Sequence, residues 1–155
     1  MWIALTRAKL QEKLTGSEYS SVKSAALGSG QVADTLIDEA LSRVTQEVRG
    51  YVSGCVRNIL GPEGTIPDEL EDAALAMALI RFLNRIPSLK SLMSPPRMEA
   101  EKQALELMKQ VAMCRFGIVA PETPAADALQ ASGAGMEVIG SRARTAKRSQ
   151  TAGLL

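Results

Sequence analysis

Carboxylates, two cysteines and scattered basic side chains are the groups with which this 155-residue chain could do chemistry, because its sequence contains no histidine. Histidine is the commonest general base and a common metal ligand. Four carboxylates stand close together in sequence, as in some cation sites; they are Asp68, Glu69, Glu71 and Asp72. They follow Pro67 at the expected start of a helix, where acidic side chains favour the positive end of the helix dipole. We interpret the cluster as a helix start and expect no bound metal.

The two cysteines, Cys55 and Cys114, are too few and too far apart in sequence for a zinc site. A secreted chain of this size more often carries a closely spaced disulfide framework. We therefore expect a reducing compartment and interpret each cysteine as a small buried hydrophobic residue. The apolar start 1–5 lacks the charged region of a signal peptide, and no apolar run approaches the roughly 20 residues that span a bilayer. A soluble intracellular protein is expected.

Catalytic motifs are missing from the sequence as well. It contains no glycine-rich phosphate loop and no recognisable pairing of a nucleophile with a base. We expect no enzymatic activity and no cofactor. Eighteen Lys and Arg against seventeen Asp and Glu give a net charge of +1, so the overall charge does not attract nucleic acid or an anionic membrane. Partners must therefore be recognised locally.

Apolar residues recur with the period of a helix through the first 116 residues, and no sustained strand alternation occurs before residue 135. The pattern predicts an all-α fold, a small helical bundle over residues 1–116 with an aliphatic core. Glycines and prolines separate five expected helices, which cover about residues 6–14, 17–27, 31–60, 66–86 and 94–116. The longest would be roughly 45 Å long, more than a compact domain of this size needs. Its apolar stripe consists of Ile37, Leu41, Val44, Val48, Tyr51 and Cys55.

The helix after Pro67 is apolar almost all round between Ala73 and Ile80. A helix of this kind lies at the centre of a bundle or of an oligomer. One small bundle is expected to hide only part of this surface, so we predict that copies meet through Ala73, Met77 and Ile80. A repeated heterologous contact closes into a ring when its rotation divides a full turn.

From residue 117 onward the periodicity disappears, and residues 117–155 are expected to form an extended C-terminal arm with few contacts to the bundle. Residues 136–139 are the one stretch of the arm with strand propensity, and they predict a short β-strand that could add to a partner's sheet edge. The expected partner-binding residues are three apolar anchors, Met136, Val138 and Ile139, and four basic contacts, Arg142, Arg144, Lys147 and Arg148.

Six short sequence motifs are spread along the whole chain, and their order carries a resemblance to a known family. They are Trp2-Ile3-x-Leu5-Thr6, Leu14-Thr15-Gly16-x-Glu18, Glu47 to Val52, Leu60 to Leu70, Gly133-x-Gly135-x-Glu137-Val138-Ile139 and Gly153-Leu154. In this order they resemble the Mu-like prophage family of small helical proteins related to the phage head–tail connector, or adaptor, proteins.

The resemblance implies a virion structural protein of bacteriophage type, a head-completion protein at the neck between capsid and tail. It would be assembled in the host cytoplasm as a ring, usually twelvefold, between the portal and the stopper or tail. Genomic DNA would pass through the lumen without sequence-specific binding, and the C-terminal arm would dock on the portal or a neighbouring subunit.

A different class remains as the alternative, a small helical nucleic-acid-binding or DNA-packaging accessory protein whose basic tail follows phosphates. The tail has no aromatic side chains to stack on bases, and its four basic residues after Ser141 make a weak electrostatic footprint.

Overall fold

Five helices form most of the computed structural model, which describes residues 1–125. They confirm the predicted all-α fold class. The helices are α1 (Arg7–Glu12), α2 (Gly16–Gly28), α3 (Ala33–Ser53), α4 (Glu71–Arg85) and α5 (Pro95–Ala112). Two 3-10 turns, η1 (Asp68–Leu70) and η2 (Pro87–Leu92), and two short strands, β1 (Trp2–Ala4) and β2 (Thr65–Pro67), complete the described elements.

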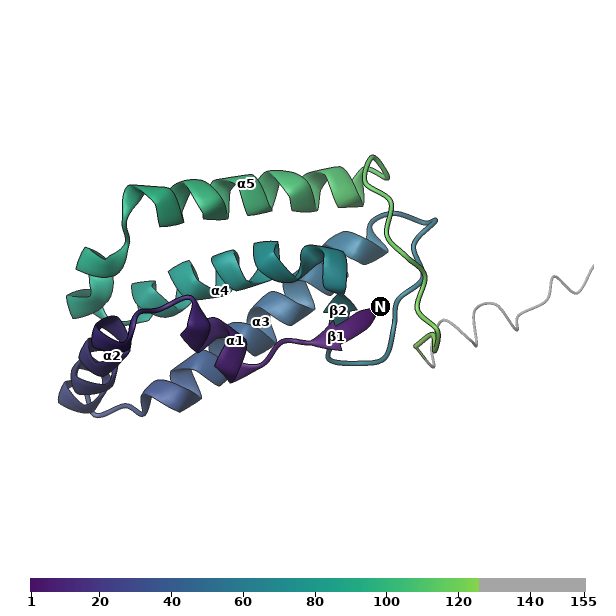
Figure 1. Cartoon of the computed structure of the whole chain (residues 1–155). Coiled ribbons are helices and arrows are strands. Elements are labelled where there is room, and N and C mark those ends of the chain that lie inside the picture. The colour runs from purple at the N-terminus through teal and green to yellow at the C-terminus, as the bar shows by residue number, and fades with distance from the viewer. Residues whose placement is uncertain (126–155) are drawn as a thin grey trace, which may run out of the picture.

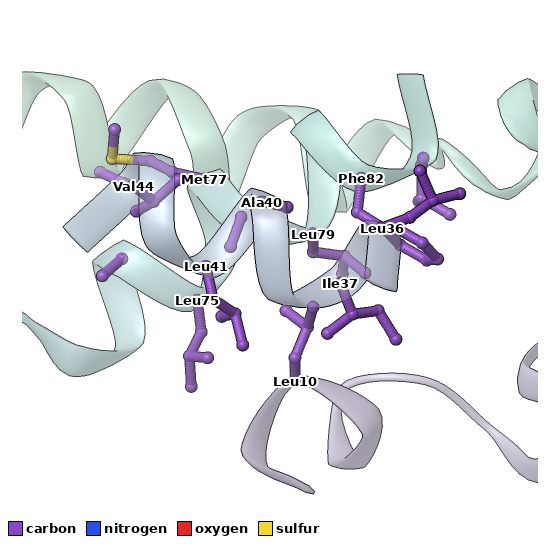
Figure 2. Packing of buried hydrophobic residues seen from close by; sticks show 14 of the residues in the cluster. Leu10, Leu36, Ile37, Ala40, Leu41, Val44, Leu75, Met77, Leu79 and Phe82 are labelled. Atoms are coloured by element: carbon purple, nitrogen blue, oxygen red, sulfur yellow. The ribbon is translucent and has the colours of Figure 1, made fainter. Parts of the chain in front are cut away.

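The three long helices α3, α4 and α5 pack against one another, with α4 in the middle of the view and α1 and α2 covering one end (Figure 1). The chain reverses twice, so the C-terminal ends of α3 and α5 lie together at one end of the molecule, opposite the α2–α3 connection. The predicted stripe of α3 faces this core, and Ile37, Val44 and Val48 are fully buried. Figure 2 shows Leu10 of α1 pointing toward Leu41 and Ile37 of α3.

Helix α3 is shorter than the predicted helix over residues 31–60. It ends at Ser53, and the side-chain amide of Asn58 donates to the carbonyl of Val52 at 3.2 Å. Gly54 follows where α3 meets α5, and a Cβ atom there would lie 3.3 Å from the Cβ of Ala112. The 21 residues of α3 span about 31 Å. The apolar residues past Gly54 therefore lie in turns after the helix and not in the helix itself.

Residues 1–116 also contain two strands, so the expectation of no strand before residue 135 is wrong. β1 and β2 pair antiparallel with Ile3 opposite Ile66. Ile66 is fully buried, and Ile3 packs against the core. Residues predicted to open the fourth helix thus pair with the chain's start, and the helix begins only at Glu71.

The start of α2 comes earlier than the sequence indicates, since Thr15 belongs to its N-cap rather than to the end of α1. The Thr15 hydroxyl accepts a hydrogen bond from the amide of Glu18, and the Glu18 carboxylate accepts one from the amide of Thr15. This reciprocal capping box satisfies two of the otherwise unpaired amides at the helix start. Pro87 and Pro95 end α4 and begin α5 as predicted.

Helix α5 ends at Ala112, four residues before the predicted end at Phe116. Cys114 adopts a φ of 58°, in the left-handed region that side chains other than glycine rarely occupy. The amide of Cys114 donates to Val111 and that of Arg115 to Gln110. This pair of bonds is the Schellman ending of a helix, with a cysteine at the position where glycine is usual.

Candidate interaction surfaces

The predicted oligomer interface on α4 lies mainly inside the bundle. Met77 is fully buried and Ile80 is 2% exposed, while Ala73 is only partly covered. Helix α4 contacts α3 on one side and α5 on another, so its apolar surface is used within a single chain. Figure 2 shows Met77 beside Val44 of α3. The sequence places such a helix at the centre of either a bundle or an oligomer, and α4 lies at the centre of the bundle. Met77 and Ile80 therefore offer no surface to another copy.

The four clustered carboxylates at the start of α4 hold neighbouring parts of the chain. Asp72 accepts from Lys13 Nζ at 2.9 Å, which lowers the pKa of Asp72. Glu71 pairs with Lys9, and Asp68 pairs with the amino group of Met1. Glu69 Oε1 accepts from the backbone amide of Val119 at 3.3 Å. Within residues 1–125, no group of three or more potential metal ligands converges.

Cys55 and Cys114 form a disulfide, so the interpretation of two separate buried thiols is wrong. Cys55 is buried as expected, and the two Cα atoms are 5.2 Å apart. The bond joins the segment after α3 to the end of α5 across 59 residues of sequence. The sequence spacing carries no signal for this pairing, because only the fold brings the two helix ends together.

The first part of the predicted arm lies against the bundle, so the expectation that it makes few contacts is wrong for residues 118–125. Trp2 Nε1 donates to the carbonyl of Val119 at 3.1 Å, and the amide of Ala125 donates to the carbonyl of Leu60 at 2.9 Å. The Trp2 ring lies so close to Gly61 that a Cβ atom there would be 2.5 Å from it. Glycine is therefore required at this position, and the arm leaves the bundle beside the N-terminal strand.

The predicted partner-binding residues lie beyond the residues that the structure describes. They are Met136, Val138, Ile139, Arg142, Arg144, Lys147 and Arg148.

Three exposed apolar residues lie in the segments that follow α3 and α5, near the disulfide. We call Val56, Ile59 and Met113 the disulfide-end patch. Val56 is 96% exposed, Met113 61% and Ile59 46%. Val56 and Met113 each adjoin one cysteine of the disulfide. Arg57 Nη2 donates to the carbonyl of Cys114 at 2.5 Å and so holds the segment after α3 to the turn that follows α5. The patch therefore sits on backbone fixed by a covalent bond and a hydrogen bond.

A second exposed apolar feature lies at the opposite end of α3, where α2 connects to it. Leu27 is 73% exposed and Val32 is 60% exposed. Together with Lys23, Ala33 and Asp34 they line a hollow of about 160 Å³, which we call the turn-end groove. Because Val32 precedes α3 and Cys55 follows it, the groove and the disulfide-end patch are about 30 Å apart.

Two much larger hollows lie elsewhere on the bundle. The first, of about 530 Å³, runs beside α3, and its arginines already have partners. Arg7 pairs with Asp34 and Asp38, while Arg49 donates to the carbonyls of the 61–65 loop. The second, of about 430 Å³, is lined by Ala76, Leu79 and Ala100 among others. Both arginines of the first hollow thus serve to hold neighbouring segments of the fold.

Comparisons with protein-family models, curated proteins and solved structures each found no match. Within residues 1–125, no helix is both long enough and apolar enough to span a membrane.

Proposed function

We propose that this chain is a structural subunit of a phage head–tail connector, a ring-forming adaptor between the portal and the stopper or tail. The order of sequence motifs along the chain supports this role. So does one structural observation that carries the proposal: a single molecule exposes two separate apolar features at opposite ends of α3, the disulfide-end patch and the turn-end groove.

Two different surfaces on one molecule suit a heterologous contact. If the patch of one copy enters the groove of the next, an open chain of copies keeps one free patch at one end and one free groove at the other. The chain therefore grows until these two ends meet and close a ring. The Val56 and Met113 side chains are exposed on one copy, and Leu27 and Val32 line the groove that would receive them on the next copy. This contact replaces the α4 surface as the proposed ring interface.

Charges beside the two features favour the same contact. Arg57 and Arg115 flank the patch on exposed positions, and Asp34 lines the groove. An arginine that approaches Asp34 would share its carboxylate with Arg7, which already lies 3.1 Å from it. Charges of this kind set the orientation and the association rate more than they set affinity.

The arm supplies the second contact of the proposed subunit. Met136, Val138 and Ile139 would dock as apolar anchors on the portal or a neighbouring subunit, with Arg142, Arg144, Lys147 and Arg148 as charge contacts. DNA would pass through the ring without specific recognition. No catalytic step, cofactor or metal is part of this role.

The proposal is tested with the purified full chain and the portal protein encoded with it. Native mass spectrometry of their mixture should reveal a closed ring of this chain on the portal, and Val56→Asp should reduce that assembly at least about tenfold. Gln103→Asp, on an exposed site of α5, is the matched control and should assemble normally. Normal rings from Val56→Asp would overturn the proposed interface, and no binding of the unaltered chain to the portal would overturn the connector role.

A further inference from the structure

The short β-ribbon has one edge whose hydrogen-bonding groups are unpaired within residues 1–125. β1 places Trp2 opposite Pro67 and Ile3 opposite Ile66. Pro67 has no N–H, so the hydrogen-bonded pair of the ladder is Ile3 with Ile66. The amide of Asp68 donates to the carbonyl of Met1 at 3.0 Å. Met1 and Asp68 lie two positions from Ile3 and Ile66, so this bond fits the same alternation.

The alternation turns the amides and carbonyls of Trp2 and Ala4 away from β2, toward the outer edge of β1. In the described part of the chain, no hydrogen bond reaches these four groups. Ala4 is exposed and Trp2 is partly exposed, so the edge is accessible at Ala4 and partly covered at Trp2. An open edge of this kind is a template for another strand.

The outer edge of β2 is closed by contrast. Arg49 Nη1 donates to the carbonyl of Thr65 at 2.8 Å, and the Thr65 amide donates to the carbonyl of Pro62 at 3.2 Å. Pro67 again lacks a donor. At Thr65 both backbone groups of β2 are already bonded, and at Pro67 the donor is missing. The edge of β1 is therefore the docking position for one more strand.

The chain itself carries a segment suited to this edge. Beyond residue 125, the stretch 136–139, Met-Glu-Val-Ile, is the one with strand propensity, and Gly135 and Gly140 flank it. The described chain ends beside β1, since Ala125 bonds to Leu60 and the neighbouring Gly61 touches the Trp2 ring.

Ten residues, 126–135, separate this point from the segment, and they can reach up to about 33 Å. A tether of that length gives the segment an effective concentration in the millimolar range at its own β1. Its own chain is therefore the favoured occupant over a second copy.

We propose that residues 136–139 add a third strand to the outer edge of β1 of the same chain in the free subunit. This inference does not depend on the connector role. It implies that the apolar anchors Met136, Val138 and Ile139 are held on the subunit until a partner competes for them, and that the open edge is covered against pairing with other chains.

The test measures amide hydrogen exchange at Trp2 and Ala4 in the full chain by NMR. The double variant Glu137→Pro/Val138→Pro removes a backbone donor from the segment whichever of the two residues faces β1. Ser149→Pro/Gln150→Pro is the matched control, with two prolines in the same tail beyond the segment. Both variants change residues outside the bundle, so the bundle should remain folded.

We expect the amides of Trp2 and Ala4 to exchange at least about tenfold faster in the Glu137→Pro/Val138→Pro variant than in the unaltered chain or the control. Their protection should not change on dilution. Equal exchange in all three proteins would overturn the proposal. Protection that falls on dilution would also overturn it, because the strand would then come from another copy.

Discussion

Arg97, in the first turn of α5, forms a bidentate ion pair with Glu18 of α2. Its two terminal nitrogens lie 2.9 and 3.0 Å from the two carboxylate oxygens of Glu18. The same guanidinium donates to the carbonyl of Leu92 at 2.8 Å, and Glu18 completes the capping box with Thr15. One ion pair therefore joins the start of α5, the end of η2 and the start of α2.

The Glu18–Arg97 pair predicts a loss of stability in acid. The hydrogen bond from Arg97, followed by that from the amide of Thr15, lowers the pKa of Glu18 from 4.5 to about 2. A carboxylate with a depressed pKa in the folded state stabilises the fold above its unfolded pKa, and this contribution is lost as pH falls through the folded value. The free energy of unfolding should decrease between about pH 4.5 and pH 2, measured by urea titration. Glu18→Gln should flatten this part of the profile, and an unchanged profile in that variant would contradict the assignment.

The disulfide should stabilise the bundle substantially. Closing a loop of 59 residues restricts the unfolded chain, so Cys55→Ser/Cys114→Ser should lower the free energy of unfolding by about 2–4 kcal/mol. Intact mass before and after reduction, which differs by two hydrogens, checks that the bond is formed in the purified protein. Equal stability of the oxidised chain and the double variant would show that the bond adds nothing to the fold.

Met77→Lys should unfold the chain rather than only block assembly. Met77 is fully buried between α3 and α5, and an unpaired ammonium there should lower the free energy of unfolding by more than about 3 kcal/mol. Met77→Leu keeps volume and polarity and serves as the control. A folded Met77→Lys variant with normal thermal melting would mean that this face of α4 reaches solvent.

Trp2 should hold the first part of the arm on the bundle. Trp2→Ala removes the hydrogen bond to Val119 and the ring that covers Gly61, so trypsin should cleave after Arg115 at least about threefold faster. Trp2→Phe keeps much of the ring and should have a smaller effect. Equal cleavage rates in all three proteins would show that residues 117–125 are held by other contacts.

The secondary structure that is visible in local sequence was predicted well. The stripe of α3 and the prolines that bound α4 and α5 signal helices within one or two turns of sequence, and Val48 and Val44 are buried as the stripe requires. The end of α3 was missed, because glycine is tolerated in a helix and the close approach of Gly54 to Ala112 becomes visible only in the fold. The strands were missed because each has three residues, and β1 pairs with a segment far along the chain.

The candidate surfaces could not be predicted from the sequence, because burial depends on which elements surround a residue. Met77 and Val56 are both apolar residues in apolar patterns, yet Met77 is fully buried and Val56 is 96% exposed. The difference arises because α4 lies between two helices, while the chain leaves α3 just before Val56. The disulfide shares this origin, since the fold brings the ends of α3 and α5 together.

The most direct test of a heterologous ring contact mixes two damaged copies. Val56→Asp keeps an intact groove, and Leu27→Asp keeps an intact patch. Each variant alone should remain a monomer under conditions in which the unaltered chain forms rings, with or without portal as template, as measured by native mass spectrometry. An equimolar mixture should form one-to-one dimers that cannot extend, because only one productive contact is left. A mixture that stays monomeric would contradict the proposed patch-to-groove contact. Dimers formed by Leu27→Asp alone would contradict it as well.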